Sequence, residues 1–303
     1  MTRATVYEVL DLFDINTYLD KSERNIQRVS NKLDDYIKNP DVENIHDIRK
    51  AIRRLEASYR SLPSKKVQDK RVIREYTEYS KKLFSINSQI RDFDIINEKL
   101  SSDEDLAQRD TMKSIERYLC KQREAKLNEA ISFALELRKL RVPEITKKIQ
   151  ISNKRSKKRF SKVIGKFATR IEHNLPIVVN DSKKIAELHE LRKDCKKLRY
   201  LLELLPEDSD KDQRSGKDNF VSILMEKLEN VQDSLGVIHD YDMIVAYLKR
   251  HKGKGTRSTL IHSILMKVNR ERHNKYKEFV KFVNGDFSTY YNDFFIRTAD
   301  VLA

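Results

Sequence analysis

Residues that favour turns or break helices are scarce in this chain. Its 303 residues include six Gly and five Pro, and no Gly occurs before Gly165. An all-β or α/β fold of this length needs many more turns than these residues can form. We therefore expect an all-α protein built from long helices.

The few helix breakers predict where those helices end. Breaks are expected at five dipeptides that end in proline and at one glycine pair: Asn39-Pro40, Leu62-Pro63, Val142-Pro143, Leu175-Pro176, Leu205-Pro206 and Gly253/Gly255. Between the breaks, apolar residues recur in steps of three and four, as in Ile45, Ile48 and Ile52. This spacing is typical of amphipathic helices and predicts about eight of them, enough for two four-helix bundles.

An internal duplication organises the sequence. Residues 45–55 align without gaps with residues 188–198, and nine of the eleven positions are identical or chemically similar. A second motif follows each copy, as Arg91-Asp-Phe-Asp94 and then as His239-Asp-Tyr-Asp242, and the two offsets are 143 and 148 residues. We therefore expect two homologous halves, residues 1–145 and 146–303, each a four-helix bundle, related by a pseudo-two-fold axis.

The first motif places a row of cations on one face of its helix, opposite the apolar face. In the first copy this row consists of His46, Arg49, Lys50 and Arg53, with Arg54 at its flank. In the second copy it consists of His189, Arg192, Lys193 and Lys196, with Lys197 and Arg199 at its flanks. The simplest alternative is that each row is only a solvated basic face. Because the row occurs twice, we favour a binding surface on which the two rows converge.

A third basic element opens the second half. Residues 147–170 contain ten Lys or Arg and no Asp or Glu. Five of these cations fall on or beside one helical face: Arg155, Lys158, Arg159, Lys162 and Lys166. Because apolar residues occupy the other face, we expect a structured cationic helix rather than a flexible basic tail.

The acidic residues of the second motif offer little catalytic chemistry. Asp92 and Asp94, like Asp240 and Asp242, are two residues apart, so their side chains diverge by about 200° around a helix. One Asp of each pair is expected to brace an Arg or Lys. The His-Asp pairs at residues 46–47 and 239–240 resemble part of the signature of all-α metal phosphohydrolases, but we recognise no further ligands. This alternative stays open, while we predict no catalytic residue, metal or cofactor.

The charge balance points to a polyanionic partner. Lys and Arg number 62 against 47 Asp and Glu, which leaves a formal charge of +15. No apolar run approaches the roughly 20 residues that span a bilayer, and the two cysteines form no disulfide framework. We expect a cytoplasmic protein with no membrane partner. Nucleic acid is one alternative polyanion, and a scaffold that docks an acidic protein is another reading of the same charge.

The two motifs together resemble the CHAD family, the conserved histidine α-helical domain. Residues 230–236, Asn-Val-Gln-Asp-Ser-Leu-Gly, resemble that family's Leu/Val-Gln-Asp-x-Leu-Gly run. The resemblance implies two four-helix bundles around a pseudo-two-fold axis, a basic central surface and binding of inorganic polyphosphate. It marks the cations of both rows as anion-binding positions, together with Arg91 and His239 of the second motif. We therefore expect a non-enzymatic polyphosphate-binding module, associated with polyphosphate granules.

Overall fold

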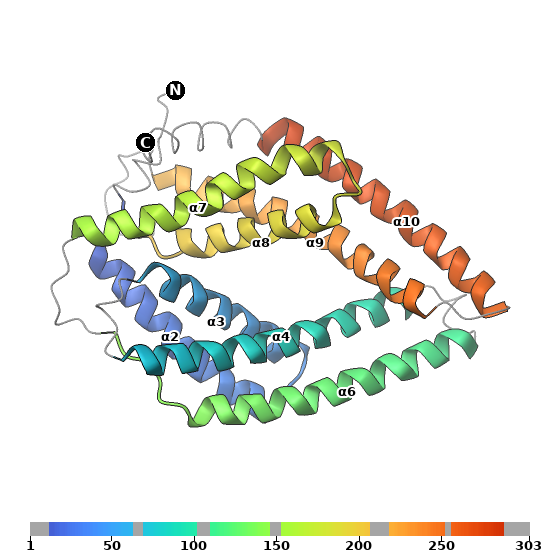
Figure 1. Cartoon of the computed structure of the whole chain (residues 1–303), viewed down its shortest axis with the longest axis horizontal. Helices are drawn as coiled ribbons and strands as arrows, with labels where there is room; N and C mark the ends of the chain where they lie inside the picture. Colours follow the sequence, from blue (N-terminus) through green and yellow to red (C-terminus); the bar gives the residue numbers. More distant parts are fainter. Residues whose placement is uncertain are drawn as a thin grey trace.

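The computed structural model describes residues 12–62, 69–101, 110–145, 153–206, 218–251 and 256–287. Within these ranges the chain is helical apart from short connections (Figure 1). Eight long helices lie in the described part: α2 (Ile15–Lys38), α3 (Val42–Ser61), α4 (Lys70–Ser101), α6 (Asp110–Lys139), α7 (Asn153–Asn180), α8 (Ile185–Leu202), α9 (Asp218–Arg250) and α10 (Thr256–Phe282). A π-helical turn, Val283–Phe287, follows α10. The expected all-α fold is confirmed.

Side-chain caps fix where the first two described helices begin. The Asp14 carboxylate accepts a hydrogen bond of 2.7 Å from the backbone N–H of Thr17, and Asp41 accepts one of 2.8 Å from Asn44. Such caps satisfy N–H groups of the first turn that have no partner within the helix. Pro40 lies between α2 and α3, where it cannot donate the hydrogen bond that would continue α2.

The break expected at Leu175-Pro176 is wrong, because α7 continues through Pro176 to its end at residue 180. Proline removes one backbone donor and normally kinks or ends a helix. Here the last turn of α7 is held by tertiary contacts. Val178 is buried in the core, and the Tyr276 hydroxyl of α10 donates to the carbonyl oxygens of Val178 and Val179 at 2.9 and 2.8 Å.

The helices pack in two groups that follow each other along the chain. In the first, α2 packs on α3 and α4 on α6; in the second, α7 and α9 pack on α8, and α10 on α9. Figure 1 shows the first group below and the second above, with α3 and α8 on the facing sides. Between the groups, α3 contacts α8 and α4 contacts α9. Each group thus contributes its second and third helices to the interface, while the boundary near residue 145 and the pseudo-two-fold axis stay predictions.

Two separate hydrophobic cores join the groups. The main core includes residues of both, and on α4 and α9 it ends at Ile90 and Ile238. The second core begins at Ile96 and Ile244, and it packs the later parts of α4 and α9 with α6 and α10. The second motif of each half, residues 91–94 and 239–242, therefore lies where one core gives way to the other.

Candidate functional site

Helices α3 and α8 bring the two cationic rows together. Arg49 and Arg53 lie one turn apart on α3, and Arg192 and Lys196 lie one turn apart on α8. The opposite faces of both helices are buried in the main core, which turns these four side chains toward the interface between the groups. The charges act on one another, since Arg192 lowers the pKa values of Arg49 and Arg53. We call these four residues the central basic cluster.

The central basic cluster is unusually desolvated for a group of cations. Burial and the neighbouring Arg53 lower the pKa of Arg49 to about 10. Burial and the three arginines of the cluster lower the pKa of Lys196 to about 6. The Arg53 guanidinium lies 4.4 Å from the centre of the Phe84 ring and makes a cation–π contact with it. Burial of like charges is costly, so the arrangement favours any anion that can reach them.

Two aspartates face the cluster, one from each group. Asp92 of α4 and Asp240 of α9 each interact with Arg91 and Arg192, and Asp92 also interacts with Arg49. Burial raises the pKa of Asp92 to about 6, an effect that Asp240 increases and Arg49 opposes. Burial likewise raises the pKa of Asp240. The two carboxylates only partly offset the clustered cations, so the region keeps an excess of positive charge.

The histidines of the motifs occupy different environments. The rings of His189 on α8 and His239 on α9 lie 4.6 Å apart, and burial together with Arg192 lowers the pKa of His239 to about 4. Burial and Lys193 also lower the pKa of His189. His46 of the first copy is 57% exposed instead, with its Nδ1 atom 4.0 Å from the Asp47 carboxylate. The two copies thus present their leading histidine differently.

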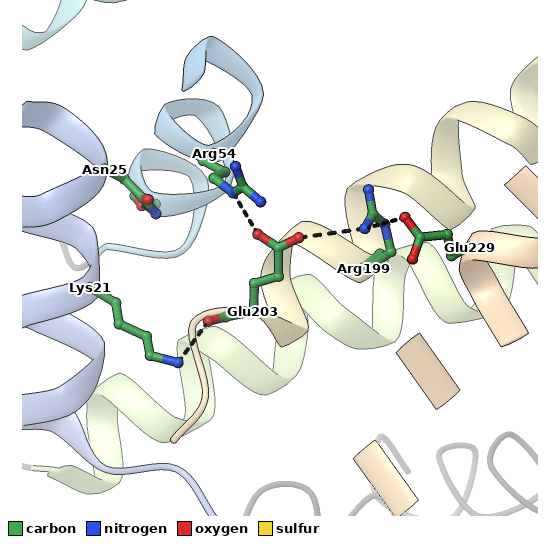
Figure 2. Close-up of polar contacts among 7 residues, drawn as sticks. Lys21, Asn25, Arg54, Arg199, Glu203 and Glu229 are labelled. Carbon is green, nitrogen blue, oxygen red and sulfur yellow. Dashed lines mark hydrogen bonds and ion pairs between the residues drawn. The ribbon is translucent and has the colours of Figure 1, made fainter. Parts of the chain in front are cut away.

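Several predicted cations at the flanks are already paired. Arg54 Nε donates to the Glu203 carboxylate at 2.7 Å, and Arg199 lies 3.7 Å from the same carboxylate and 2.9 Å from that of Glu229 (Figure 2). Lys193, which belongs to the second row itself, likewise pairs with Glu190. The positive charge of these side chains is therefore partly offset by ion pairs with acidic side chains of the protein.

Lys197 belongs to a further flank, where α8 meets α7. It lies 3.4 Å from the buried Asp194 carboxylate, which Arg170 of α7 also contacts at 2.9 Å. The Phe167 ring of α7 lies under Lys197 and under Arg60 of α3, at 5.5 and 5.3 Å. Arg60 and Arg170 were not predicted from the motifs, because they lie outside both copies. Arg60 extends the positive charge toward α7, whereas the charge of Arg170 is offset by Asp194 and Glu190, each at 2.9 Å.

The expected cationic helix is present as α7, but its basic face points elsewhere. The five predicted cations are exposed side chains of α7: Arg155, Lys158, Arg159, Lys162 and Lys166. None of them is among the main charges that shift the pKa values in the central basic cluster. Lys50, at the edge of the first row, is exposed as well. The structure therefore does not bring the α7 cations into the central site.

The later aspartate of each second motif makes the same contact in both groups. Asp94 of α4 accepts a hydrogen bond of 2.6 Å from Arg123 of α6. Asp242 of α9 accepts from Arg272 of α10. The expectation that one Asp of each pair braces a cation is confirmed, and the partners Arg123 and Arg272 are 149 residues apart, close to the motif offset of 148.

Two further observations concern the described residues only. No three His, Cys, Asp or Glu side chains among them gather closely enough to hold a metal ion. None of their helices is both long and apolar enough to cross a membrane.

The family model of the CHAD domain matches residues 23–249. This chain belongs to the CHAD family. Among solved structures, the CHAD domain from the plant Ricinus communis is 13% identical, has a TM-score of 0.57, and matches over 89% of this chain and 91% of its own. PptA from Streptomyces chartreusis is 11% identical, has a TM-score of 0.57, and matches over 88% and 98%. These likenesses show the CHAD fold alone, and no curated protein matches the chain.

Proposed function

We propose that the central basic cluster binds inorganic polyphosphate and that the protein acts as a non-enzymatic polyphosphate-binding module. The observation that carries this proposal is the convergence of Arg49, Arg53, Arg192 and Lys196 from two helices, with only partial compensation by acids. Membership of the CHAD family supports the choice of ligand, because polyphosphate binding is what the motif resemblance implies.

The chemistry of polyphosphate suits such a cluster. The polymer carries about one negative charge per phosphate and no sequence information, so its receptor needs closely spaced cations rather than base-reading side chains. Arginine can bind phosphate oxygens with two parallel hydrogen bonds, and lysine supplies a mobile point charge. An incoming polyanion would also relieve the mutual repulsion of the three arginines and would favour the charged form of Lys196. Binding should weaken steeply as salt concentration rises, as it does for proteins that neutralise nucleic acid phosphates.

The contacts of the His-Asp pairs favour a binding role over metal-dependent hydrolysis. The Asp47 carboxylate accepts from Lys32 of α2 at 2.9 Å, and Asp240 of α9 interacts with Arg192 of the neighbouring helix α8. Both carboxylates thus interact with cations of the protein. We expect no phosphate release from polyphosphate in the presence of Mg²⁺ or Mn²⁺. Release that is lost in Asp47→Ala/Asp240→Ala would instead make the protein an enzyme.

Binding of labelled long-chain polyphosphate tests the proposal. The site variant is His46→Ala/Arg49→Ala/His189→Ala/Arg192→Ala, which removes two formal charges at neutral pH. Its matched control is Lys113→Ala/Arg117→Ala, which removes the same charge from exposed positions one turn apart on α6. The site variant should lose at least about tenfold in affinity, or about 1.4 kcal/mol, while the control binds like the wild type.

Circular dichroism establishes that each variant is folded, and Arg49→Gln/Arg192→Gln replaces the site variant if it is not. Single-stranded DNA serves as the competitor at matched charge. An equal loss of polyphosphate affinity in the site variant and in the control, or equal competition by DNA, would show that the cluster is a general basic surface without preference for polyphosphate. Association with polyphosphate granules in cells follows from the proposal and would be seen as co-localisation that the site variant loses.

A further inference from the structure

A second group of cations lines a pocket between the two helix groups. The pocket has a volume of about 420 Å³, within the range of about 300–1,000 Å³ that is usual for small-molecule sites. Helix α2 forms one wall with Lys21, Arg24, Asn25 and Arg28. Leu12 before α2, Arg54 of α3, the end of α8 with the residues that follow it, and the start of α9 form the rest. Figure 2 shows four of the lining residues, which are Lys21, Asn25, Arg54 and Glu203.

Two of the four cations hold the pocket together. Lys21 Nζ donates to the carbonyl oxygens of Glu203 and Leu205 at 3.1 and 2.6 Å. Arg54 Nε donates to the Glu203 carboxylate at 2.7 Å. Asn25 is likewise engaged, since its side-chain amide donates to Ser58 at 3.1 Å. These contacts fix the end of α8 against α2 and α3, so the pocket has a rigid polar base.

The other two cations, Arg24 and Arg28, do not take part in these contacts. They lie one turn apart on α2, both are exposed, and neither forms an ion pair with another described residue. Like charges at this spacing repel by roughly 0.2–0.5 kcal/mol per pair. The pocket lining holds one carboxylate, Glu203, which Arg54 already offsets. Two guanidinium groups are thus available to one ligand at the pocket wall.

Much of the remaining lining is apolar. The apolar residues are Leu12, Leu202, Leu205, Pro206, Val221 and Met225. This apolar lining distinguishes the pocket from the central basic cluster, which consists of cations on facing helices. The arginines of the pocket select for anionic oxygens.

We propose that this pocket binds a short run of phosphates, held by Arg24 and Arg28. The free end of a polyphosphate chain and a nucleoside triphosphate both supply this chemistry. The inference goes beyond the proposed function, because it assigns a second site whose cations are separate from the central basic cluster.

The methyl groups of methionine provide a local test. The chain has five methionines. Met225 lines the pocket, and Met243 lies one turn after His239 on α9, near the central site. Carbon-13 methyl NMR of the full chain, titrated with inorganic tripolyphosphate, should shift the Met225 resonance in a saturable way. Met225→Leu assigns that resonance, and Met243→Leu assigns the one that reports on the central site.

The arginines are tested by variants that keep the fold. Arg24→Ala/Arg28→Ala should weaken the titration of Met225 at least about tenfold, as expected when two charge-assisted contacts to phosphate are lost. The control Lys113→Ala/Arg117→Ala should leave it unchanged. A second titration with ATP identifies the source: tighter binding of ATP indicates a nucleoside triphosphate, and tighter binding of tripolyphosphate indicates an inorganic chain end.

The outcomes separate the two proposals. If Met225 does not shift while Met243 does, or if Arg24→Ala/Arg28→Ala titrates like the wild type, the pocket is not a phosphate site and the central proposal stands. If Met225 shifts and long-chain polyphosphate binds the Arg49→Gln/Arg192→Gln variant as well as it binds the wild type, the pocket is a site and the central proposal fails.

Discussion

His189 on α8 and His239 on α9 hold their rings 4.6 Å apart at the edge of the central basic cluster. Burial lowers the pKa values of both, and the nearby cations Arg192 and Lys193 lower them further, while Glu190 opposes this for His189. Both rings are therefore neutral at pH 7 in the free protein. A polyanion beside them would favour the charged form, so binding and protonation are coupled.

This coupling predicts tighter polyphosphate binding at pH 6 than at pH 8. If the complex restores the ordinary pKa of about 6.5 to His239, affinity rises about fourfold between pH 8 and pH 6 from this residue alone. The measurement is the dissociation constant at both pH values and constant ionic strength. His189→Gln/His239→Gln should reduce the ratio, and an unchanged ratio would show that neither histidine takes up a proton.

Asp92 contributes to the same pH dependence in the same direction. Its pKa is raised to about 6, so its negative charge is present at pH 8 and largely absent at pH 5. Asp92→Asn should therefore bind polyphosphate about fivefold more tightly than the wild type at pH 8, which corresponds to about 1 kcal/mol of repulsion removed. At pH 5 the two proteins should bind alike. Weaker binding by Asp92→Asn at pH 8 would mean that Asp92 mainly positions Arg49.

Burial of Lys196 lowers the stability of the folded protein. Burial among three arginines lowers its pKa to about 6, so folding disfavours its charged form and stability falls as pH decreases from about 10.5 toward 6. Lys196→Met keeps the length of the side chain without the charge. At pH 7.5 the variant should be more stable by about 1–4 kcal/mol in urea unfolding and should bind polyphosphate several-fold more weakly. A loss of stability would show that Lys196 makes a necessary polar contact.

The fold was predictable because helix formation and helix breaking leave local signals. The low Gly and Pro content and the three-four spacing of apolar residues predicted the helices, and the breaks expected at Pro40, Pro143 and Pro206 fall outside them. The breaks expected at Pro63 and at Gly253/Gly255 lie outside the described residues. Pro176 was mispredicted, since its effect is overridden by Val178 in the core and by Tyr276, which lies 100 residues away in sequence. Long-range packing of this kind leaves no local sequence signal.

The part of the candidate site that comes from the duplicated motif could be predicted from the sequence. Arg49 and Arg192 stand at equivalent places in the two copies, and the structure brings both to one interface. The α7 cations lie outside this interface. This was mispredicted because the sequence of a basic helical face does not indicate which neighbouring helix that face contacts. Glu203 and Phe84 were missed, since each acts through contacts with residues distant in sequence. The Arg123 and Arg272 partners could have been found from their repeat offset.

The largely buried pair formed by Asp242 and Arg272 should contribute more to stability than its counterpart in the first group. Both of its side chains are 11% exposed, whereas Asp94 and Arg123 are 16% and 28% exposed. Removing one partner of a buried pair leaves an uncompensated charge, at a cost of about 3–5 kcal/mol. Asp242→Ala should therefore lower the free energy of unfolding by about that amount, and Asp94→Ala by less. Equal losses would mean that exposure does not control the two contacts.

Glu203 should limit the affinity for polyphosphate, because its carboxylate offsets two cations at the flank of the cluster. It lies 2.7 Å from Arg54 and 3.7 Å from Arg199. Glu203→Gln removes the negative charge while keeping a hydrogen-bond acceptor for Arg54. We expect several-fold tighter polyphosphate binding and a steeper dependence of affinity on salt, because more cations become available to phosphates.

The matched control for Glu203→Gln is Glu78→Gln, which removes a carboxylate paired with Arg74 at 3.1 Å on α4. This pair is largely exposed, so its loss should change stability by less than about 1 kcal/mol and leave polyphosphate affinity unchanged. An equal gain in both variants would attribute the effect to net charge alone. A gain confined to Glu203→Gln assigns Arg54 and Arg199 to the path of the polyanion, as the motif resemblance implies.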